Sequence, residues 1–267
     1  MNASPTTPSK GSAERWGPLW GSRAADWARS EEMQMPGYEE AVRRVGLTRG
    51  QRVLDVGCGA GVFLSLCAAL GAEPHGIDAS EELLALARDR VPEADLRRGD
   101  MQFLPYEDDQ FDLVTGFTSF FFAADMVEAL REAGRVARPG APIVIQAWGN
   151  PEHNDLEAMK VIARPFLSGS KSTAPPPLWQ PGVLEEMAVA AGLGPRETFD
   201  FSFPYEYPDD ETLGSLLLAP AGLAALVGAE REDEVRVQIV EAMAPYRGPD
   251  GVYRLHNELR YLLPEAP

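Results

Sequence analysis

Three closely spaced glycines follow a short apolar segment in RVLDVGCGAGVF, which runs from residue 52 to residue 63. The first five of these residues suit a buried β-strand, and Gly57, Gly59 and Gly61 come after them. Glycine is disfavoured inside strands, so its use here indicates a turn to which another group comes close. The next residues predict a helix whose first N–H groups face that group. The sequence therefore predicts a strand, a glycine turn and a helix that form a ligand site.

Segments typical of strands alternate with segments typical of helices from residue 50 to residue 148. The expected strands cover 52–56, 73–78, 94–100, 111–117 and 142–148, and the expected helices cover 62–70, 80–90 and 125–137. Strands and helices that alternate at this spacing form βαβ units and a parallel sheet covered on both faces.

The pattern changes after residue 148. Helices are expected near 155–167, 183–194, 210–228 and 231–244, and strands at 196–208 and 252–263. The stretch 168–180 is rich in proline, serine and glycine, so we expect a mobile loop. The first 14 residues are small and polar, so we expect them to be disordered.

Charged residues around the glycine turn discriminate between cofactors. Val62 stands where a dinucleotide fingerprint has its third glycine. Asp55 precedes the turn, where its charge repels a pyrophosphate but suits a sulfonium cofactor that carries an ammonium group. Asp78 ends the second expected strand, where a carboxylate can hold both ribose hydroxyls. Asp100 and Met101 lie at the end of the third strand, where a carboxylate can accept a hydrogen bond from an adenine amino group and an apolar neighbour can cover the ring.

Four segments resemble the successive motifs of class I S-adenosylmethionine-dependent methyltransferases, namely VLDVGCGAG, GIDAS, RRGDMQFLPYEDDQFDLV and RVARPGAPIVI. The chain looks most like the group of ubiquinone and menaquinone methyltransferases and similar small-molecule enzymes, over residues 50–148. The resemblance implies an α/β, Rossmann-like, mostly parallel sheet of seven strands, in which antiparallel strand seven lies between strands five and six. We expect one domain over 15–267: a helical lid at 15–48, the cofactor core at 50–148, and acceptor-binding and cap elements at 149–267 with a helical insertion between strands six and seven.

S-adenosylmethionine is the cofactor that the resemblance implies. Its methionine part is expected near the glycine turn, its ribose at Asp78, its adenine at Asp100, and its sulfur near Phe117. The expected cofactor-binding residues are Asp55, Gly57, Cys58, Gly59, Gly61, Asp78, Ala79, Asp100, Met101 and Phe117. No set of cysteines and histidines has metal-ligand spacing, so we expect no metal.

Aromatic residues gather where the acceptor is expected, outside the carboxyl ends of the parallel strands. The expected pocket residues are Phe120, Trp148, Tyr205 and Tyr253. Such a lining favours an apolar or aromatic small molecule. His153 follows the fifth strand at the same edge, as either a solvated loop residue or a general base, and we take it as the candidate catalytic residue. Trp16, Trp20 and Trp27 fall on one helical face, which either packs on the domain or covers the cofactor.

The overall charge argues against a nucleic-acid partner, because 24 basic against 41 acidic residues give −17. Cys58 and Cys67 are the two cysteines of the sequence, which fits a reducing compartment. We find no signal peptide and no apolar run long enough for a membrane span, so we expect a cytoplasmic protein without a membrane partner.

These observations predict an enzyme that transfers a methyl group to an O, N or C atom of an apolar or aromatic metabolite. The alternative is a protein of the same fold that binds S-adenosylmethionine without methyl transfer, either a cyclase-like catalyst or a ligand-binding module. A nicotinamide oxidoreductase is disfavoured by Asp55 and Val62.

Overall fold

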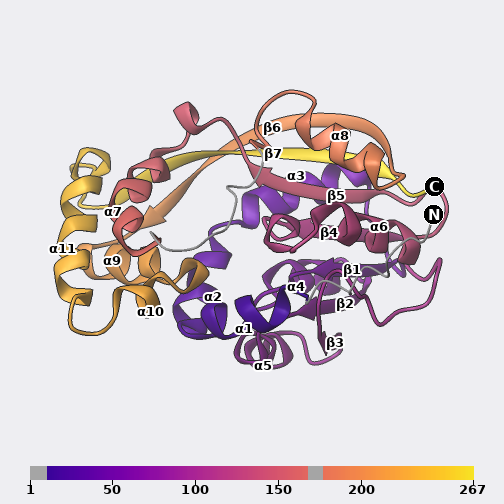
Figure 1. Ribbon diagram of the computed structural model, residues 1–267, viewed down its shortest axis with the longest axis horizontal. Helices are drawn as coiled ribbons and strands as arrows, with labels where there is room; N and C mark the ends of the chain where they lie inside the picture. Colours follow the sequence, from indigo (N-terminus) through magenta and orange to yellow (C-terminus); the bar gives the residue numbers. More distant parts are fainter. Residues whose placement is uncertain (1–10, 168–176) are drawn as a thin grey trace, which may run out of the picture.

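The computed structural model describes residues 11–167 and 177–267 (Figure 1). The N-terminal segment expected to be disordered, residues 1–14, lies mostly outside the described residues, although Ala13 and Glu14 already belong to the first helix. Most of the expected mobile loop, 168–180, also lies outside them.

One seven-stranded sheet organises the molecule, in the order β3-β2-β1-β4-β5-β7-β6. Its parallel strands are β1 (Arg52–Val56), β2 (Glu73–Asp78), β3 (Asp95–Arg98), β4 (Leu113–Phe117) and β5 (Ile143–Trp148). β7 (Tyr253–Glu265) runs antiparallel to both β5 and β6 (Gly194–Tyr207). The expected Rossmann-like order, with antiparallel strand seven between strands five and six, is confirmed.

Two apolar cores lie on the two faces of the sheet, because alternate strand residues point to opposite faces. One core joins Val53 and Leu113 to α3 (Met35–Val45), α4 (Val62–Ala69) and α5 (Glu81–Arg90). The other joins Leu54 and Val114 to α6 (Met126–Val136) and α8 (Val183–Ala190). Helices therefore cover both faces of the sheet, and the carboxyl ends of the parallel strands form the edge at which a ligand can bind.

Two short helices, α1 (Ala13–Gly21) and α2 (Ala24–Glu32), precede α3. The expectation of one helical face for the three tryptophans is wrong, because the chain turns at Ser22 and Arg23 and places Trp27 in a second helix. The rings of Trp20 and Trp27 nevertheless meet at a centroid distance of 4.6 Å. The turn folds the segment back on itself over the core helices.

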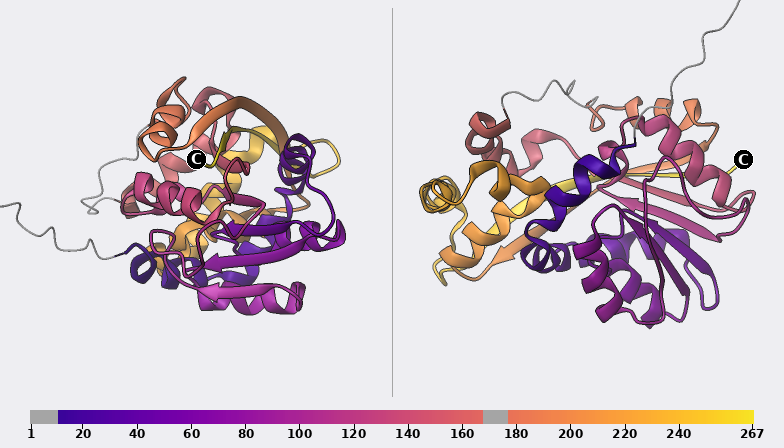
Figure 2. Two further views of the ribbon diagram at one scale, coloured as in Figure 1. Left: turned by 90° about the vertical axis from the view of Figure 1, so that its right-hand side faces the viewer. Right: turned by 60° about the horizontal axis from the view of Figure 1, so that its bottom comes forward.

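The helical insertion forms a lobe at the far end of the long strands β6 and β7 (Figure 1; Figure 2, right). It consists of α9 (Asp210–Leu218), α10 (Leu223–Val227) and α11 (Glu232–Met243), against which α7 (Ala158–Leu167) packs. β6 and β7 carry this lobe away from the remaining strands, which leaves α1 and α2 between the lobe and the core of the sheet (Figure 1). Among the described residues, no helix has the length and hydropathy needed to cross a bilayer.

Candidate active site

The glycine turn is approached closely by other parts of the chain. Gly57, Gly59 and Gly61 have φ values of 80°, 53° and 79°, a left-handed conformation that glycine adopts readily. A Cβ atom on Gly59 would lie 2.6 Å from Oε2 of Glu31, and one on Gly57 would lie 2.5 Å from Cβ of Ser119. The turn therefore needs glycine for two reasons: its backbone conformation and the side chains packed against it.

Asp78 lies at the carboxyl end of β2, beside the turn. Its two oxygens accept hydrogen bonds from the backbone N–H groups of Gly59, at 3.0 Å, and Ser80, at 2.8 Å. Burial raises the pKa of this carboxyl, while the backbone hydrogen bonds act in the opposite direction. Asp78 is thus fixed at the end of its strand, with acceptor capacity left for a ligand.

Asp55 is buried beneath the turn. Its Oδ1 accepts a hydrogen bond of 2.7 Å from the hydroxyl of Thr115. Burial and, to a smaller extent, the charge of Asp78 raise its pKa to about 7, against the lowering effect of the hydrogen bond from Thr115. Cys58 is also buried, with Sγ under Gly76, and burial raises its thiol pKa, so it is not a reactive thiolate.

A small cavity of about 80 Å³ lies between the turn and the N-terminal helices. Seven of the ten expected cofactor residues line it: Gly57, Gly59, Asp78, Ala79, Asp100, Met101 and Phe117. Asp55, Cys58 and Gly61 do not line it, and Gly61 instead packs closely on Ala87 of α5. We call this space the cofactor-side cavity.

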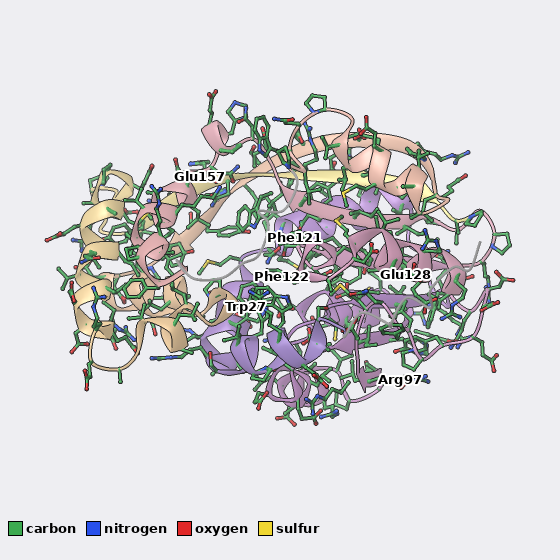
Figure 3. The ribbon with its side chains drawn as sticks, in the orientation of Figure 1. Trp27, Arg97, Phe121, Phe122, Glu128 and Glu157 are labelled. Atoms are coloured by element: carbon green, nitrogen blue, oxygen red, sulfur yellow. The ribbon has the colours of Figure 1, made fainter. Side chains whose placement is uncertain are left out.

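Aromatic rings from α1, α2 and the 3₁₀ turn η1 (Phe120–Phe122) fill much of the cofactor-side cavity. Phe122 makes edge-to-face contacts with Trp16 and Trp20, at centroid distances of 4.9 and 5.4 Å. Figure 3 labels Trp27, Phe121 and Phe122 near the centre of the view, between the lobe and the core. Small-molecule sites usually measure about 300–1,000 Å³, so these rings must move before a cofactor fits.

The start of α1 covers the end of the cavity at which Asp100 lies. Oδ2 of Asp100 accepts a hydrogen bond of 2.7 Å from the N–H of Ala13 and a longer one of 3.4 Å from the hydroxyl of Ser12. Its other oxygen accepts one of 2.9 Å from the N–H of Gln102. Asp100 is therefore engaged by the N-terminal segment and by its own turn.

A second cavity, of about 640 Å³, lies between the end of β5 and the lobe. We call it the acceptor-side cavity, and its lining is mostly apolar. Its lining residues include Phe121, Trp148, Leu156, Met159, Leu178, Trp179, Leu217 and Leu223. The charged side chains of its described lining are Glu157 and Lys160, which form an ion pair at 2.6 Å.

Only Trp148, of the four residues expected in the substrate pocket, lines the acceptor-side cavity. Phe120 is buried under Gly116, and Tyr205 belongs to the core beside Phe203. Tyr253 is buried, and its hydroxyl donates a hydrogen bond of 2.8 Å to Asp210 of α9. These three aromatic residues belong to the two apolar cores on the faces of the sheet, so their expected place in the substrate pocket is wrong.

His153 lies in the 3₁₀ turn η2 (Pro151–His153) after β5, at the expected edge of the sheet. Its side chain is 57% exposed, with Nδ1 2.8 Å from Oε2 of Glu258. It lines neither of the two cavities, whereas the next residue, Asn154, lines the acceptor-side cavity. Its role as a general base stays a prediction.

Several residues at the cofactor-side cavity were not expected from the sequence. Thr118 and Ser119 line it directly after β4, and Thr118 has a φ of 47°, which is unusual for a β-branched residue. Glu31 reaches the turn from α2, and its position one helical turn after Trp27 was the available signal. Within the described ranges, no group of three or more His, Cys, Asp or Glu side chains could hold a metal ion.

Residues 54–145 match the family model described as a methyltransferase domain. With the seven-stranded sheet and its glycine turn, this match defines the class: the chain carries a class I S-adenosylmethionine-dependent methyltransferase domain. S-adenosylmethionine is the cofactor of this class.

A demethylmenaquinone methyltransferase of Halalkalibacterium halodurans is 33% identical over 121 residues, which are 42% of this chain and 49% of that protein. The chain spans about half the length of the curated relatives that it matches. A crystal structure of a candidate methyltransferase from Bacillus halodurans C-125 matches 86% of this chain and 98% of its own, with a TM-score of 0.58 and 18% identity. The [4+2]-cyclase SpnF matches 86% of this chain and 79% of its own, with a TM-score of 0.56 and 20% identity. At these identities the structural likeness shows the fold.

Proposed function

We propose that the protein transfers a methyl group from S-adenosylmethionine to an O, N or C atom of an apolar or aromatic small molecule. The observation that carries the proposal is the adjacency of two cavities across η1. Phe122 lines the cofactor-side cavity and Phe121 lines the acceptor-side cavity, and their rings are 4.7 Å apart. Methyl transfer needs two such sites in direct contact, and we infer that η1 is the boundary between them.

The residues of the cofactor-side cavity fit the chemistry of the cofactor. The Asp78 carboxylate suits the two ribose hydroxyls, and Asp100 suits the adenine amino group once α1 has moved from it. Met101 and Ala79 offer apolar cover for the ring. The nearby Asp55 suits a cationic cofactor better than a pyrophosphate.

The chain's contribution to catalysis is mainly positioning. When bound, S-adenosylmethionine would supply a methyl group activated by its sulfonium. Transfer to the acceptor would leave S-adenosylhomocysteine, and a base or water would take up the acceptor's proton. The apolar lining orients the acceptor and excludes water, and such positioning can supply about 7–11 kcal/mol. A protonated acceptor such as an alcohol needs a base, for which His153, oriented by Glu258, is our proposal.

Substitution of Asp78 tests the cofactor part of the proposal. Asp78→Ala removes a carboxylate from the ribose, so we expect affinity for S-adenosylmethionine to fall roughly 30–1,000-fold, which corresponds to about 2–4 kcal/mol. Calorimetry measures this, with Asp78→Asn as a near-isosteric variant and the exposed Asp89→Ala as the control. Unchanged affinity in a folded Asp78 variant would reject the ribose assignment.

Product analysis separates methyl transfer from the alternative of cofactor binding without transfer. We expect purified protein, S-adenosylmethionine and an apolar acceptor to yield S-adenosylhomocysteine and an acceptor heavier by one methylene. Native mass spectrometry of the purified protein offers a route to that acceptor, because a ligand that co-purifies is detected by its mass. Conversion of an acceptor without consumption of the cofactor would favour the alternative.

A further inference from the structure

Glu31 contacts the glycine turn from a distant part of the chain. Its Oε2 accepts a hydrogen bond of 2.7 Å from the N–H of Ala60, and its Oε1 accepts one of 3.0 Å from the N–H of Val62. Ala60 belongs to the turn and Val62 is the first residue of α4. The side chain of Glu31 lies directly over Gly59. The anion-binding end of α4 is thus taken by a carboxyl group of the protein itself.

Glu31 is only 3% exposed and has no cationic partner within ion-pair distance among the described residues. Arg90, whose charge acts on Glu31, is instead paired with Glu32 at 2.9 Å. Two further acidic residues lie close by. The charge of Asp55 raises the pKa of Glu31, and the charge of Asp78 raises the pKa of Asp55. A buried carboxylate without a cation is costly, so this end of the site favours a ligand with positive charge.

The amino-acid end of S-adenosylmethionine carries both an ammonium group and a carboxylate. The N–H groups of Ala60 and Val62, which would suit that carboxylate, are already bonded to Glu31. A second carboxylate beside Glu31 would be repelled, whereas an ammonium group would be attracted. The position of Glu31 over Gly59 therefore selects the ammonium group as its neighbour.

We infer that Glu31 is a cofactor-binding residue, through which α2 supplies the carboxylate that faces the ammonium group of S-adenosylmethionine across the glycine turn. The inference rests on the proposed function, because it needs that cofactor. It also explains why the N-terminal helices lie on the cofactor core: they complete the site as well as cover it. Trp27, one helical turn earlier on α2, lines the cofactor-side cavity, as does Gly59, over which Glu31 lies.

Two ligands that share a neutral thioether sulfur and differ at the amino-acid end provide the test. S-adenosylhomocysteine carries the ammonium group, whereas 5′-methylthioadenosine keeps the adenosine and the sulfur but lacks the amino-acid end. Calorimetry with both ligands is carried out on the parent protein, Glu31→Gln and the control Glu32→Gln. In Glu31→Gln we expect the Kd of S-adenosylhomocysteine to rise about 10–100-fold and that of 5′-methylthioadenosine to change less than about twofold.

Each other outcome has a defined meaning. A similar rise for both ligands would mean that Glu31 only shapes the turn, and an unchanged or lower Kd for S-adenosylhomocysteine would mean that it does not bind the ammonium group. Both results overturn the inference. If Glu31→Gln does not fold, Glu31→Asp withdraws the carboxylate by one methylene, and we expect a smaller rise confined to S-adenosylhomocysteine. Failure of the parent protein to bind S-adenosylmethionine would instead overturn the proposed function.

Discussion

At the scale of single residues, the cofactor site is unusual for the carboxyl groups it buries. Glu31 and Asp55 are both under 5% exposed, and both are held by short hydrogen bonds to neutral donors. Burial raises the pKa of Glu31 to about 8 and that of Asp55 to about 7, so protons are bound near neutral pH in the ligand-free protein. These groups therefore link stability to pH.

Stability of the ligand-free protein should fall as the pH rises. Both pKa values are higher in the folded than in the unfolded chain, so the stabilisation is complete below about pH 4 and is lost as the pH passes about 7 to 8. The variant Glu31→Gln has no titrating group at this position. We expect the free energy of unfolding, measured with urea, to fall between pH 6 and pH 8.5 by about 1–3 kcal/mol more in the parent than in Glu31→Gln. Equal losses would show that Glu31 does not hold a proton in the folded state, and Glu32→Gln serves as the control.

At the scale of helices and strands, α1 approaches the core through glycine. A Cβ atom on Gly17 would collide with the backbone oxygen of Ala79, which follows β2. The helical glycine Gly214 of α9 differs, since its nearest neighbour would be 3.4 Å away on the flexible side chain of Arg236. Of these two glycines, Gly17 is required by the close approach of α1 to the backbone of Ala79, whereas the position of Gly214 has room for a larger residue.

Alanine substitution of these two glycines should have opposite effects. Gly214→Ala is expected to stabilise the protein by about 0.5–1 kcal/mol, because alanine favours the helix and has room. Gly17→Ala should push α1 from Ala79, so that the amides of residues 13–21 exchange faster. Thermal unfolding and hydrogen exchange measure the two effects. Unchanged exchange over 13–21 would show that this contact does not hold α1 in place.

At the scale of the whole molecule, the two cavities lie at different parts of the sheet. The core holds the glycine turn, and β6 and β7 extend beyond it to support the lobe of α7, α9, α10 and α11 (Figure 1). The acceptor-side cavity lies where the lobe meets the end of β5. The two cavities share no described lining residue, so we expect that a substitution in the lining of the acceptor-side cavity leaves the lining of the cofactor-side cavity unchanged.

Truncation of Trp148 tests this separation. Its side chain is 39% exposed at the end of β5, so Trp148→Ala should fold. We expect the affinity for an apolar probe, 1-anilinonaphthalene-8-sulfonate, to fall about 5–30-fold because apolar contact area is lost. The Kd of S-adenosylmethionine should stay within about twofold, since Trp148 does not line that cavity. Fluorescence titration checks the probe, with the exposed Val189→Ala as control, and a parallel loss of cofactor affinity would contradict the separation.

The sequence by itself determined the features that depend on local pattern and on sheet topology. Alternating strands and helices specify a parallel sheet, and the carboxyl ends of its strands must meet at one edge. Asp78 and Asp100 could be assigned to one edge of the sheet for that reason, because each lies at or near a strand end, and the family resemblance implied the same place for Phe117.

Only the tertiary structure decided which distant side chains meet that edge. Glu31 reaches Ala60 because α2 crosses the start of α4, which follows from packing between segments about 30 residues apart rather than from any local pattern. Tyr253 was expected to line the substrate pocket, but its side chain is buried and its hydroxyl donates a hydrogen bond to Asp210 of α9. A period of two fixes the face on which a side chain lies, whereas long-range packing fixes whether that face meets a ligand or the core.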